Sequence, residues 1–362
     1  MPSAPMMVGF DELMQASGLT GTTRPIDDDT VLAAVNECYG FSGDLRRIAT
    51  EKDDTFELRT QRAQRHLVKI SGPAEPPGVV NLQTEALLHV ARHAPHLPVP
   101  ALESGVDGRY EYAIGDRVPR ILRIMTFLDG CPLASQHPTP AQLALVGNAH
   151  ARLSAALADF THREQHRVLA WDLRYVPVLR EQLSQVDSSA RSAIAASVID
   201  AFDAAIGNAN FVLNTHVVHG DLSPYNVLVD PSLSRYVTGV IDFGDVNYTA
   251  EVFDVAIAMS NLINPNAEDP WGAALALFAG YARLRPLAGA DVLLLPVAVA
   301  ARSVQRALIA QWRATHDSSR AEYVLSHALN DWAVVERLSP ATWQSVIDRI
   351  NALNSLDGTG VS

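Results

Sequence analysis

Three polar side chains in the middle of the chain have the types and the spacing that phosphoryl transfer requires. Asp221 is followed five positions later by Asn226, and Asp242 ends an apolar run that leads into Phe243 and Gly244. Phosphoryl transfer needs a carboxylate near the acceptor hydroxyl, and it needs oxygen ligands that hold Mg²⁺ beside the nucleotide phosphates. We therefore expect Asp221 to act as the base or to orient the acceptor hydroxyl, and Asn226 and Asp242 to bind Mg²⁺.

Mg²⁺ suits these two ligands because waters and substrate phosphates supply most of its coordination shell, so one amide and one carboxylate are enough. The simple alternative is a hairpin in which Asp and Asn residues cap the turns. That alternative accounts for one such residue. It does not account for an ordered set of four polar positions within β-forming apolar runs, namely His219, Asp221, Asn226 and Asp242.

The same stretch resembles a known family. It has His219-Gly220-Asp221 where protein kinases have His-Arg-Asp. This replacement resembles the aminoglycoside phosphotransferase and choline kinase superfamily of small-molecule kinases. Residues 239–245 and 252–258 resemble the hydroxylysine kinase branch more specifically. The resemblance extends over roughly residues 27–340. It implies a protein-kinase-like two-lobed fold of the α+β class, with an antiparallel sheet plus a helix in the N-lobe and a mainly helical C-lobe.

The resemblance also implies a site for ATP or GTP between the lobes. Lys69 lies in an apolar run and would neutralise the α- and β-phosphates. The polar turn at residues 51–55, which contains no glycine, would lie over the phosphates, although an ordinary charged hairpin tip is the alternative. Backbone groups near Thr126 and Leu128, at the hinge between the lobes, would bind the edge of the purine.

Kinase-type folds place an acidic or amide partner for this lysine on a helix. The helix expected from about residue 80 to residue 94 offers Gln83 and Glu85. At 100° per residue the apolar residues of this helix share the side of Gln83, and Glu85 falls on the opposite side. We favour Gln83 as the partner of Lys69, but Glu85 has the stronger charge and the sequence leaves the choice open.

Other polar residues are expected to have structural or acceptor-binding roles. By the resemblance, Asp254 holds the backbone of the catalytic loop, and we expect His219 to anchor the same loop, because a buried imidazole usually bonds to its neighbours. The acidic surplus of the chain suits a cationic acceptor. Three carboxylates are candidates for binding its ammonium group: Asp245, Glu251 and Glu322.

Three histidines raise the possibility of a second metal site. His89 and His93 are four positions apart on the expected helix, and His96 follows it. The zinc-protease motif requires a glutamate directly after the first histidine, and none is present. We therefore expect these histidines to be solvated or to cap the end of the helix.

Composition excludes several classes of protein. The chain has 362 residues, of which 48% are hydrophobic, so it can bury a large core. Its net charge of −12 argues against a nucleic-acid polymer as a partner. The two cysteines, Cys38 and Cys131, are too few for a disulfide framework and indicate a reducing, cytoplasmic location. No signal peptide is evident, and the most apolar run, residues 292–301, is shorter than the roughly 20 residues that span a bilayer, so we expect no membrane partner.

We expect three segments along the chain: a partly loose extension at 1–26, a nucleotide-binding N-lobe at 27–128, and a helical C-lobe at 129–362 with the catalytic loop and the acceptor site. Strands are expected within residues 41–70 and at 109–114 and 120–128. Helical spacing predicts helices at 27–39, 80–94, 141–158, 176–186, 191–206 and 255–263, and a helical region at 266–350.

These expectations combine into an ATP- or GTP-dependent kinase that acts on a small-molecule acceptor, a hydroxylysine-like amino acid or an amino alcohol. Three alternatives are an antibiotic kinase with the same fold, a nucleotide-binding pseudokinase without transfer, and a scaffolding module. The intact set of Lys69, Asp221, Asn226 and Asp242 argues against the last two. The acceptor, the nucleotide and the oligomeric state stay open.

Overall fold

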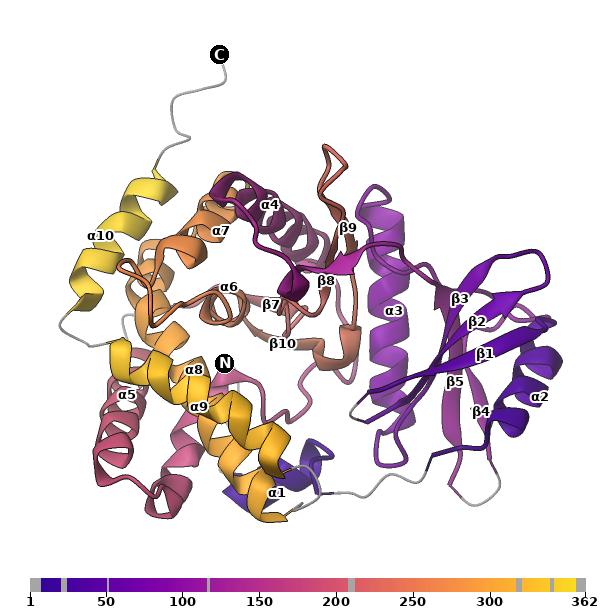
Figure 1. Ribbon diagram of the computed structural model, residues 1–362, viewed down its shortest axis with the longest axis horizontal. Helices are drawn as coiled ribbons and strands as arrows, with labels where there is room; N and C mark the ends of the chain where they lie inside the picture. Colours follow the sequence, from indigo (N-terminus) through magenta and orange to yellow (C-terminus); the bar gives the residue numbers. More distant parts are fainter. Residues whose placement is uncertain are drawn as a thin grey trace.

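A five-stranded antiparallel sheet forms the first part of the fold in the computed structural model (Figure 1). The structure describes residues 8–20, 25–50, 52–115, 118–207, 212–316, 321–338 and 342–355, with the backbone alone for 321–328. The strands lie in the order β1-β2-β3-β5-β4. Their bounds are Gly43–Ile48 for β1, Asp54–Thr60 for β2, Arg65–Ile70 for β3, Tyr112–Ile114 for β4 and Arg120–Thr126 for β5.

The two faces of this sheet have different partners. Helix α2 (Asp28–Tyr39) covers one face, where its apolar residues form a small core with those of the sheet, including Val68 and Ile70 of β3. Side chains alternate between the faces of a strand, so Lys69 points from the other face. Arg123 lies directly opposite Lys69 on β5. The second face therefore carries two basic side chains.

Helix α3 (Pro77–His93) stands between the sheet and the helical part of the molecule (Figure 1). Its Leu82, Ala86 and Val90 belong to the large core of the helical part. Its Gln83 instead contacts the buried Arg123 of the sheet. This helix thus connects the sheet that carries Lys69 to the rest of the fold.

The second part of the molecule is mainly helical (Figure 1). Its helices are α4 Pro140–Leu157, α5 Ser189–Gly207, α6 Glu251–Ser260, α7 Gly272–Ala282, α8 Gly289–His316, α9 Ala321–Arg337 and α10 Trp343–Asn354, with short 3₁₀ segments η1 Leu133–Ser135, η2 Leu173–Gln185 and η3 Phe243–Asp245. Two small sheets position the loops described below. One is β6-β8-β9 (Cys131–Pro132, Val227–Val229, Val237–Val240), and the other pairs β7 (Thr215–Val218) with β10 (Asn247–Ala250).

The predicted fold class is confirmed: an antiparallel sheet with helices precedes a mainly helical part. Several predicted bounds are shifted by a few residues, as for the helix predicted at 255–263, which is α6, and two local predictions differ more strongly. The strand predicted at 109–114 is shorter and is formed by β4 alone. The helix predicted at 176–186 is the 3₁₀ segment η2, which contains Pro177. A proline inside a helix removes one backbone hydrogen bond and clashes with the preceding turn, which explains the irregular geometry.

The N-terminal segment contributes to the core of the helical part. Helix α1 (Phe10–Ala16) buries Phe10, Leu13 and Met14, and all three belong to that core. The predicted loose extension also includes residues 1–7 and 21–24, which lie outside the described residues. Helix α8 is long and apolar enough to cross a bilayer, but 89% of its most apolar window is buried inside the protein, as in a core helix.

A buried carboxylate in the first turn of α8 leads to a prediction about stability. Asp291 is 1% exposed, and among the described residues its Oδ1 has no hydrogen-bond partner. Burial, and then the charge of Glu251, raise the pKa of Asp291 to about 6. The protonated form is therefore favoured in the folded state. Its contribution to stability is complete below the unfolded pKa of about 3.9 and is lost as the pH rises through about 6.

We expect Asp291→Asn to gain stability relative to the wild type as the pH rises from 5 to 8, by roughly 1–2 kcal/mol, because the amide cannot ionise. Urea unfolding of both proteins at the two pH values measures this difference. Asp200→Asn, which changes an exposed carboxylate on α5, is the control. A difference between variant and wild type that is the same at both pH values would contradict the assignment.

Candidate active site

The loop after β7 is held by buried hydrogen bonds. Gly220 has a φ of +82°, and a Cβ at this position would lie 2.4 Å from the carbonyl oxygen of Asp245, so only glycine fits. The N–H of Gly220 donates to Oδ1 of Asp254 at 2.8 Å, and Oδ2 of Asp254 contacts Nε2 of His150 at 2.7 Å. Asp254 thus holds the loop backbone, as the resemblance implies.

His219 connects this loop to the end of β9. It is 1% exposed, and its Nε2 lies 3.1 Å from the carbonyl oxygen of Ile241. Burial lowers the pKa of His219, which favours the neutral ring with Nε2–H as the donor. The contact is that of a loop anchor, because the nitrogen that faces a carbonyl cannot at the same time accept a proton.

Asp221 and Asn226 face each other across the loop. Nδ2 of Asn226 donates to Oδ2 of Asp221 at 2.7 Å and to its carbonyl oxygen at 2.9 Å. The carbonyl of Asn226 accepts the N–H of Ile241 at 2.9 Å, so the pairing of β8 with β9 brings Asn226 beside the residue that precedes Asp242. The two halves of the sequence motif therefore meet at one edge of this small sheet.

Asp242 has an unusual backbone conformation for a residue other than glycine. Its φ is 61° and its ψ is 80°, in the left-handed region, which Asp and Asn tolerate better than most residues. Its Oδ1 accepts hydrogen bonds from Nζ of Lys69 at 3.0 Å and from the N–H of Gly244 at 3.2 Å. The structure thus brings the predicted metal ligand to the predicted phosphate-binding lysine, 173 positions away in sequence.

Lys69 has a second carboxylate partner, Asp53, that was not among the predicted site residues. Oδ2 of Asp53 lies 3.0 Å from Nζ of Lys69, and Oδ1 of Asp53 accepts the N–H of Gly72 at 2.8 Å. Burial alone would lower the pKa of Lys69, but the charges of Asp242 and then Asp53 outweigh burial and raise it. Lys69 is therefore a permanent cation. Asp53 lies in the polar turn at 51–55, which the resemblance places over the phosphates. That expected position was the feature of the sequence that could have pointed to Asp53.

The preference for Gln83 as the partner of Lys69 is wrong, and Glu85 does not replace it. Oε1 of Gln83 accepts a hydrogen bond from Nη2 of Arg123 at 2.7 Å. Arg123 is 2% exposed and lies opposite Lys69 on the neighbouring strand, so it reaches α3 and takes the amide that was assigned to the lysine. The helix periodicity located the inner face of α3 correctly, but it could not show which basic side chain of the sheet would reach that face.

Of the two hinge residues expected to bind the purine, Thr126 already uses its backbone N–H in a hydrogen bond within the protein. The N–H of Thr126 donates to the carbonyl of Ala101 at 2.8 Å, and its hydroxyl accepts the N–H of Ala101 at 2.9 Å. In the described part of the chain, no backbone hydrogen bond is assigned to the N–H of Leu128. A role for Leu128 in binding the base is thus compatible with the structure, whereas the N–H of Thr126 is already occupied.

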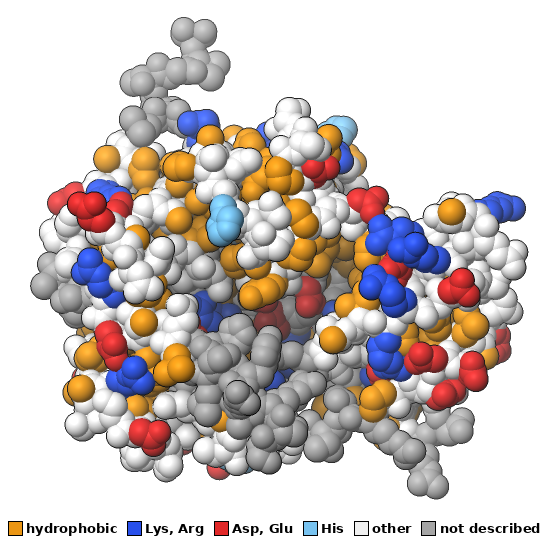
Figure 2. Space-filling model, viewed as in Figure 1, with side chains coloured by type: hydrophobic (Ala, Val, Ile, Leu, Met, Phe, Trp, Pro, Cys, Tyr) orange, Lys and Arg blue, Asp and Glu red, His pale blue; other side chains and the backbone are white. Residues whose placement is uncertain are grey.

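The carboxylate of Asp221 has acidic and basic neighbours. Its side chain is 31% exposed, and Nη2 of Arg302 lies 3.9 Å from its Oδ1. Burial raises the pKa of Asp221 to about 7, with a further increase from the charge of Asp245 and an opposing effect of Arg302. Figure 2 shows a hollow between the sheet and the helical part, with acidic side chains at its bottom.

Arg302 and Asp245 therefore lie near the position expected for the acceptor. Arg302 is 4% exposed, and its Nη1 donates to the carbonyl of Trp171 at 2.8 Å and to Oε1 of Gln305 at 2.7 Å. Among the described residues its Nε has no partner. Burial lowers the pKa of Arg302 to about 10, so the side chain is still a cation at neutral pH.

Of the other two candidates for binding an ammonium group, Glu251 and Glu322, the structure describes the side chain of Glu251 only. Glu251 is 3% exposed and binds Arg285 through both carboxylate oxygens, and it also accepts the Tyr281 hydroxyl. The suggestion that Glu251 binds the acceptor is therefore wrong, because its charge is already neutralised inside the core. The side chain of Glu322 lies outside the described residues.

The donor set fits a Mg²⁺ ion. With the amide nitrogen of Asn226 turned to Asp221, its Oδ1 has no hydrogen-bond partner within the described ranges, and neither does Oδ2 of Asp242. The charge of Lys69 is the main cause that lowers the pKa of Asp242, to about 2, so this carboxylate is ionised. An amide oxygen and a carboxylate oxygen are the hard ligands that Mg²⁺ prefers.

The ion pair between Lys69 and Asp53 leads to a second prediction. In kinase-type sites the lysine needs an acidic partner, and here Asp53 takes that position instead of α3. We expect Asp53→Asn, which keeps an acceptor for Gly72, to lower kcat/KM for the nucleotide about 10- to 100-fold, the usual range for a hydrogen bond to a charged group. Steady-state kinetics with varied nucleotide measures this effect.

Asp44→Asn, which changes an exposed carboxylate on β1 of the same sheet, is the control and should leave kcat/KM unchanged. Tighter nucleotide binding by Asp53→Asn would show that Asp53 competes with the phosphates for Lys69, and the positioning role would then be abandoned.

Comparisons with known proteins agree with this geometry. Residues 44–287 match the sequence pattern of the phosphotransferase enzyme family. Hydroxylysine kinase of Mus musculus is 28% identical over 330 residues, which are 84% of this chain and 87% of the mouse protein. Homoserine kinase of Acidiphilium cryptum is 28% identical over 276 residues, 74% of this chain and 81% of that protein.

A solved structure has the same fold. The microcompartment-associated aminopropanol kinase superposes with a TM-score of 0.69 at 21% sequence identity, and the match covers 88% of this chain and 98% of the aminopropanol kinase chain. At this level of identity the likeness concerns the fold. It agrees with the two-part arrangement, in which a sheet carries the lysine and a helical part carries the loop with Asp221.

Proposed function

The chain belongs to the phosphotransferase enzyme family, and we propose that this small-molecule kinase transfers the γ-phosphoryl group of ATP or GTP to a hydroxyl of a hydroxylysine-like amino acid. The observation that carries the proposal is the convergence of two pairs, Lys69 with Asp242 and Asn226 with Asp221, which the backbone hydrogen bond from Ile241 to Asn226 brings side by side. These side chains come from three separate stretches of the sequence. A structural role alone would not require a lysine, an amide and two carboxylates at one position.

Each of these side chains has a distinct task in the transfer. Lys69 neutralises the phosphates, and Asp221 accepts the proton of the acceptor hydroxyl or orients it for in-line attack. Asn226 and Asp242 would hold Mg²⁺, which when bound would offset the negative charge on the phosphates. Because little covalent chemistry is asked of the protein, positioning and charge neutralisation supply most of the rate enhancement.

Two charges beside Asp221 favour an amino acid as the acceptor. Nη2 of Arg302 lies 3.9 Å from Oδ1 of Asp221, so a cation that suits a carboxylate borders the acceptor position, and the charge of Asp245 acts on the same Asp221 and suits an ammonium group. A hydroxylated amino acid carries both groups. An amino alcohol or an aminoglycoside carries the ammonium group only and offers no carboxylate to Arg302.

The names of relatives support the same class of acceptor. Hydroxylysine and homoserine, the substrates in the names of two relatives, are both hydroxylated amino acids. Aminopropanol, in the name of the solved structure, is an amino alcohol and represents the second candidate. We further expect the protein to work in the reducing cytoplasm, where Cys38 and Cys131 stay free thiols, as both are here.

A panel of acceptors tests the proposal. The purified protein is incubated with Mg²⁺ and either ATP or GTP, and phosphorylated products are detected by mass spectrometry. The acceptors are 5-hydroxylysine, homoserine, 1-amino-2-propanol and an aminoglycoside. We expect phosphorylation of the amino acids. Nucleotide binding without a product from any acceptor would support a pseudokinase, and turnover of the aminoglycoside alone would support an antibiotic kinase.

The role of Arg302 is tested by the ratio of two kcat/KM values. The wild type is expected to prefer 5-hydroxylysine over its decarboxylated analogue by about 10- to 100-fold, which corresponds to one charge-assisted hydrogen bond. Arg302→Met should remove most of this preference, and Arg302→Lys should retain part of it. Thermal melts confirm that each variant is folded. An unchanged ratio in folded Arg302→Met would exclude a contact between this side chain and the acceptor carboxylate.

A further inference from the structure

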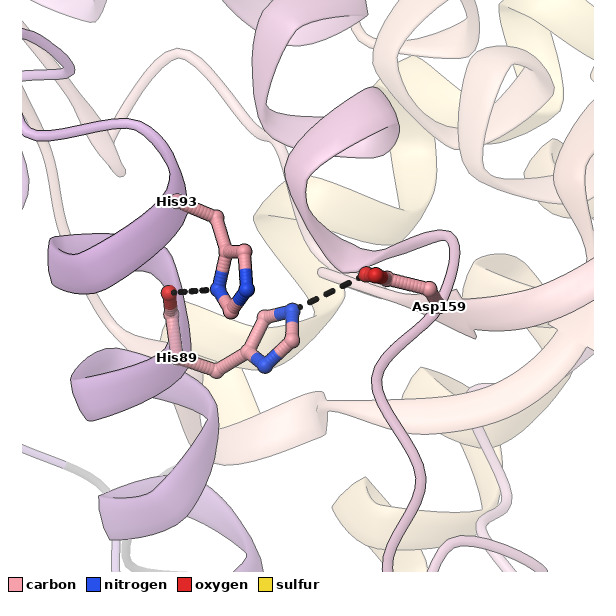
Figure 3. A group of neighbouring side chains, drawn as sticks. All are labelled: His89, His93 and Asp159. Carbon is pink, nitrogen blue, oxygen red and sulfur yellow. Dashed lines mark hydrogen bonds and ion pairs between the residues drawn. The ribbon is translucent and has the colours of Figure 1, made fainter.

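A second group of metal-binding side chains lies at the far end of α3. His89 and His93 are one turn apart on this helix, and Asp159 follows the end of α4 (Figure 3). Potential ligand atoms of the three residues all lie within 4.8 Å of one another. We propose that His89, His93 and Asp159 form a binding site for a divalent transition-metal ion of the zinc, cobalt and nickel type, separate from the Mg²⁺ site.

The contact between His89 and Asp159 already has the spacing of two ligands on one ion. Nε2 of His89 lies 3.1 Å from Oδ1 of Asp159. With metal–ligand bonds of about 2.0–2.2 Å, two tetrahedral ligands are separated by roughly 3.3–3.5 Å. An ion can therefore take the place of the proton between these two atoms after a small side-chain adjustment.

The tautomer of His93 is set by its own helix. Its Nδ1 lies 2.9 Å from the carbonyl oxygen of His89, which can only accept, so Nδ1 carries the proton. Nε2 of His93 then has a free lone pair. A ligating histidine usually donates its other N–H to a carbonyl or a carboxylate in this way. Figure 3 shows the second ring nitrogen of His93 on the side of the His89–Asp159 contact.

The surroundings hold His89 and leave room for His93 to turn. The imidazole of His89 lies between the ring of Phe160, at 5.1 Å between centroids, and the ring of His93, which is stacked on it at 4.0 Å with 26° between the planes. Because a ring nitrogen binds a metal in the plane of its ring, the exposed ring of His93 has to rotate for both histidines to bind one ion. His93 and Asp159 are exposed and border an open hollow of about 640 Å³. Three protein ligands with water in the remaining positions are typical of an open site.

The ligand types select the metal. Two imidazole nitrogens and one carboxylate favour Zn²⁺, Co²⁺, Ni²⁺ or Cu²⁺, whereas Mg²⁺ and Ca²⁺ prefer sets made of oxygen alone. The sequence suggested that these histidines cap the helix, and the contact from His93 to the carbonyl of His89 is such a cap. The third ligand could not be foreseen, because Asp159 is 70 positions away from His89.

The site spans two parts of the fold. His89 and His93 belong to α3, which also carries the Gln83 that holds Arg123 of the sheet, and Asp159 belongs to the helical part. A bound ion would add a cross-link between α3 and the segment after α4. Since the ion binds the folded state, it should raise the free energy of unfolding with the logarithm of its concentration above the Kd.

Titration of the whole, metal-free protein with Co²⁺ tests the proposal, with visible absorption as the readout. An excess of Mg²⁺ occupies the oxygen ligands at Asn226 and Asp242 and leaves a histidine site free. We expect one Co²⁺ per chain with d–d bands of a nitrogen–oxygen site, competition by Zn²⁺, and a higher Tm with Zn²⁺. His93→Gln and Asp159→Asn should each weaken Co²⁺ binding at least tenfold and remove the rise in Tm.

His96→Gln is the matched control, because His96 borders the same hollow but does not belong to the three-residue group. It should bind Co²⁺ like the wild type. The proposal is overturned if the wild type binds none of these metals, or if His93→Gln and Asp159→Asn bind Co²⁺ as tightly as the wild type. Circular dichroism in the presence of a chelator shows whether the variants are folded.

Discussion

Replacement of Asp221 by asparagine is expected to lower kcat by about 10²- to 10⁴-fold, the usual contribution of a general base. The amide has the same shape and can still face Nδ2 of Asn226 through its oxygen, as the carboxylate does at 2.7 Å. It cannot accept a proton from the acceptor hydroxyl. The loss should therefore appear in the transfer step, measured as the rate of product formation in a single turnover.

The Kd for the nucleotide shows whether Asp221→Asn removes the base alone or disturbs the whole site. Asp221 has no contact with Lys69, so Asp221→Asn should bind Mg·ATP with a Kd close to that of the wild type. Asp230→Asn changes a carboxylate whose contacts are local, to Ser232, and it serves as the control for both readouts. If Asp221→Asn lost nucleotide binding as well as transfer, the assignment of Asp221 as the base would be contradicted.

Asp242→Asn is expected to abolish the Mg²⁺ dependence of nucleotide binding and to reduce turnover by at least about 10³-fold. Asparagine tolerates the left-handed backbone of this position, so the change tests the charge with little added strain. The variant keeps an acceptor for the N–H of Gly244 but loses the anion that pairs with Lys69 and that we propose as a metal ligand. Alanine would confuse the two effects, because it is less tolerant of a φ of 61°.

Isothermal titration with ATP at several Mg²⁺ concentrations measures this prediction. In the wild type, the Kd for ATP should fall as Mg²⁺ is added, and in Asp242→Asn it should not respond. Asp200→Asn, on the surface of α5, is the control. If Asp242→Asn responded to Mg²⁺ as the wild type does, the ligand role of Asp242 would be falsified.

The central motif could be predicted from sequence because its chemistry depends on local spacing. Asp221 and Asn226 lie on one loop, and their hydrogen bond needs no distant element. The approach of Asp242 follows from the antiparallel pairing of β8 with β9, which a short hairpin permits. Alternation along β3 likewise follows from the sequence and places Lys69 on the face opposite to Val68 and Ile70.

Errors arose where a side chain had more than one possible distant partner. Periodicity placed Gln83 on the inner face of α3, but Arg123 competes with Lys69 for it from the neighbouring strand. The sequence gives no sign of a partner for Glu251, but Arg285, 34 positions later, neutralises the charge of its carboxylate in the core. Such choices depend on tertiary packing, which short-range patterns do not contain.

The polar turn at 51–55 illustrates a third case. The sequence suggested its place over the nucleotide, and the structure adds that its Asp53 is ion-paired with Lys69. The reach of a turn across a sheet depends on the strand register, in which Asp54 pairs with Ile70 and so brings Asp53 to the end of β3. This register is set by the turn between β2 and β3, and its sequence Gln61-Arg62-Ala63-Gln64 contains no glycine and no other hairpin signature from which the register could be derived.

The most direct test of the account is a crystal structure of the protein with Mg²⁺ and a non-hydrolysable ATP analogue. We predict that Asn226 and Asp242 contact the metal ion, that Lys69 contacts the phosphates, and that the carboxylate of Asp221 stays free to meet an acceptor hydroxyl. A nucleotide bound elsewhere, or a metal ion held by other residues, would contradict the assignment of this site to phosphoryl transfer.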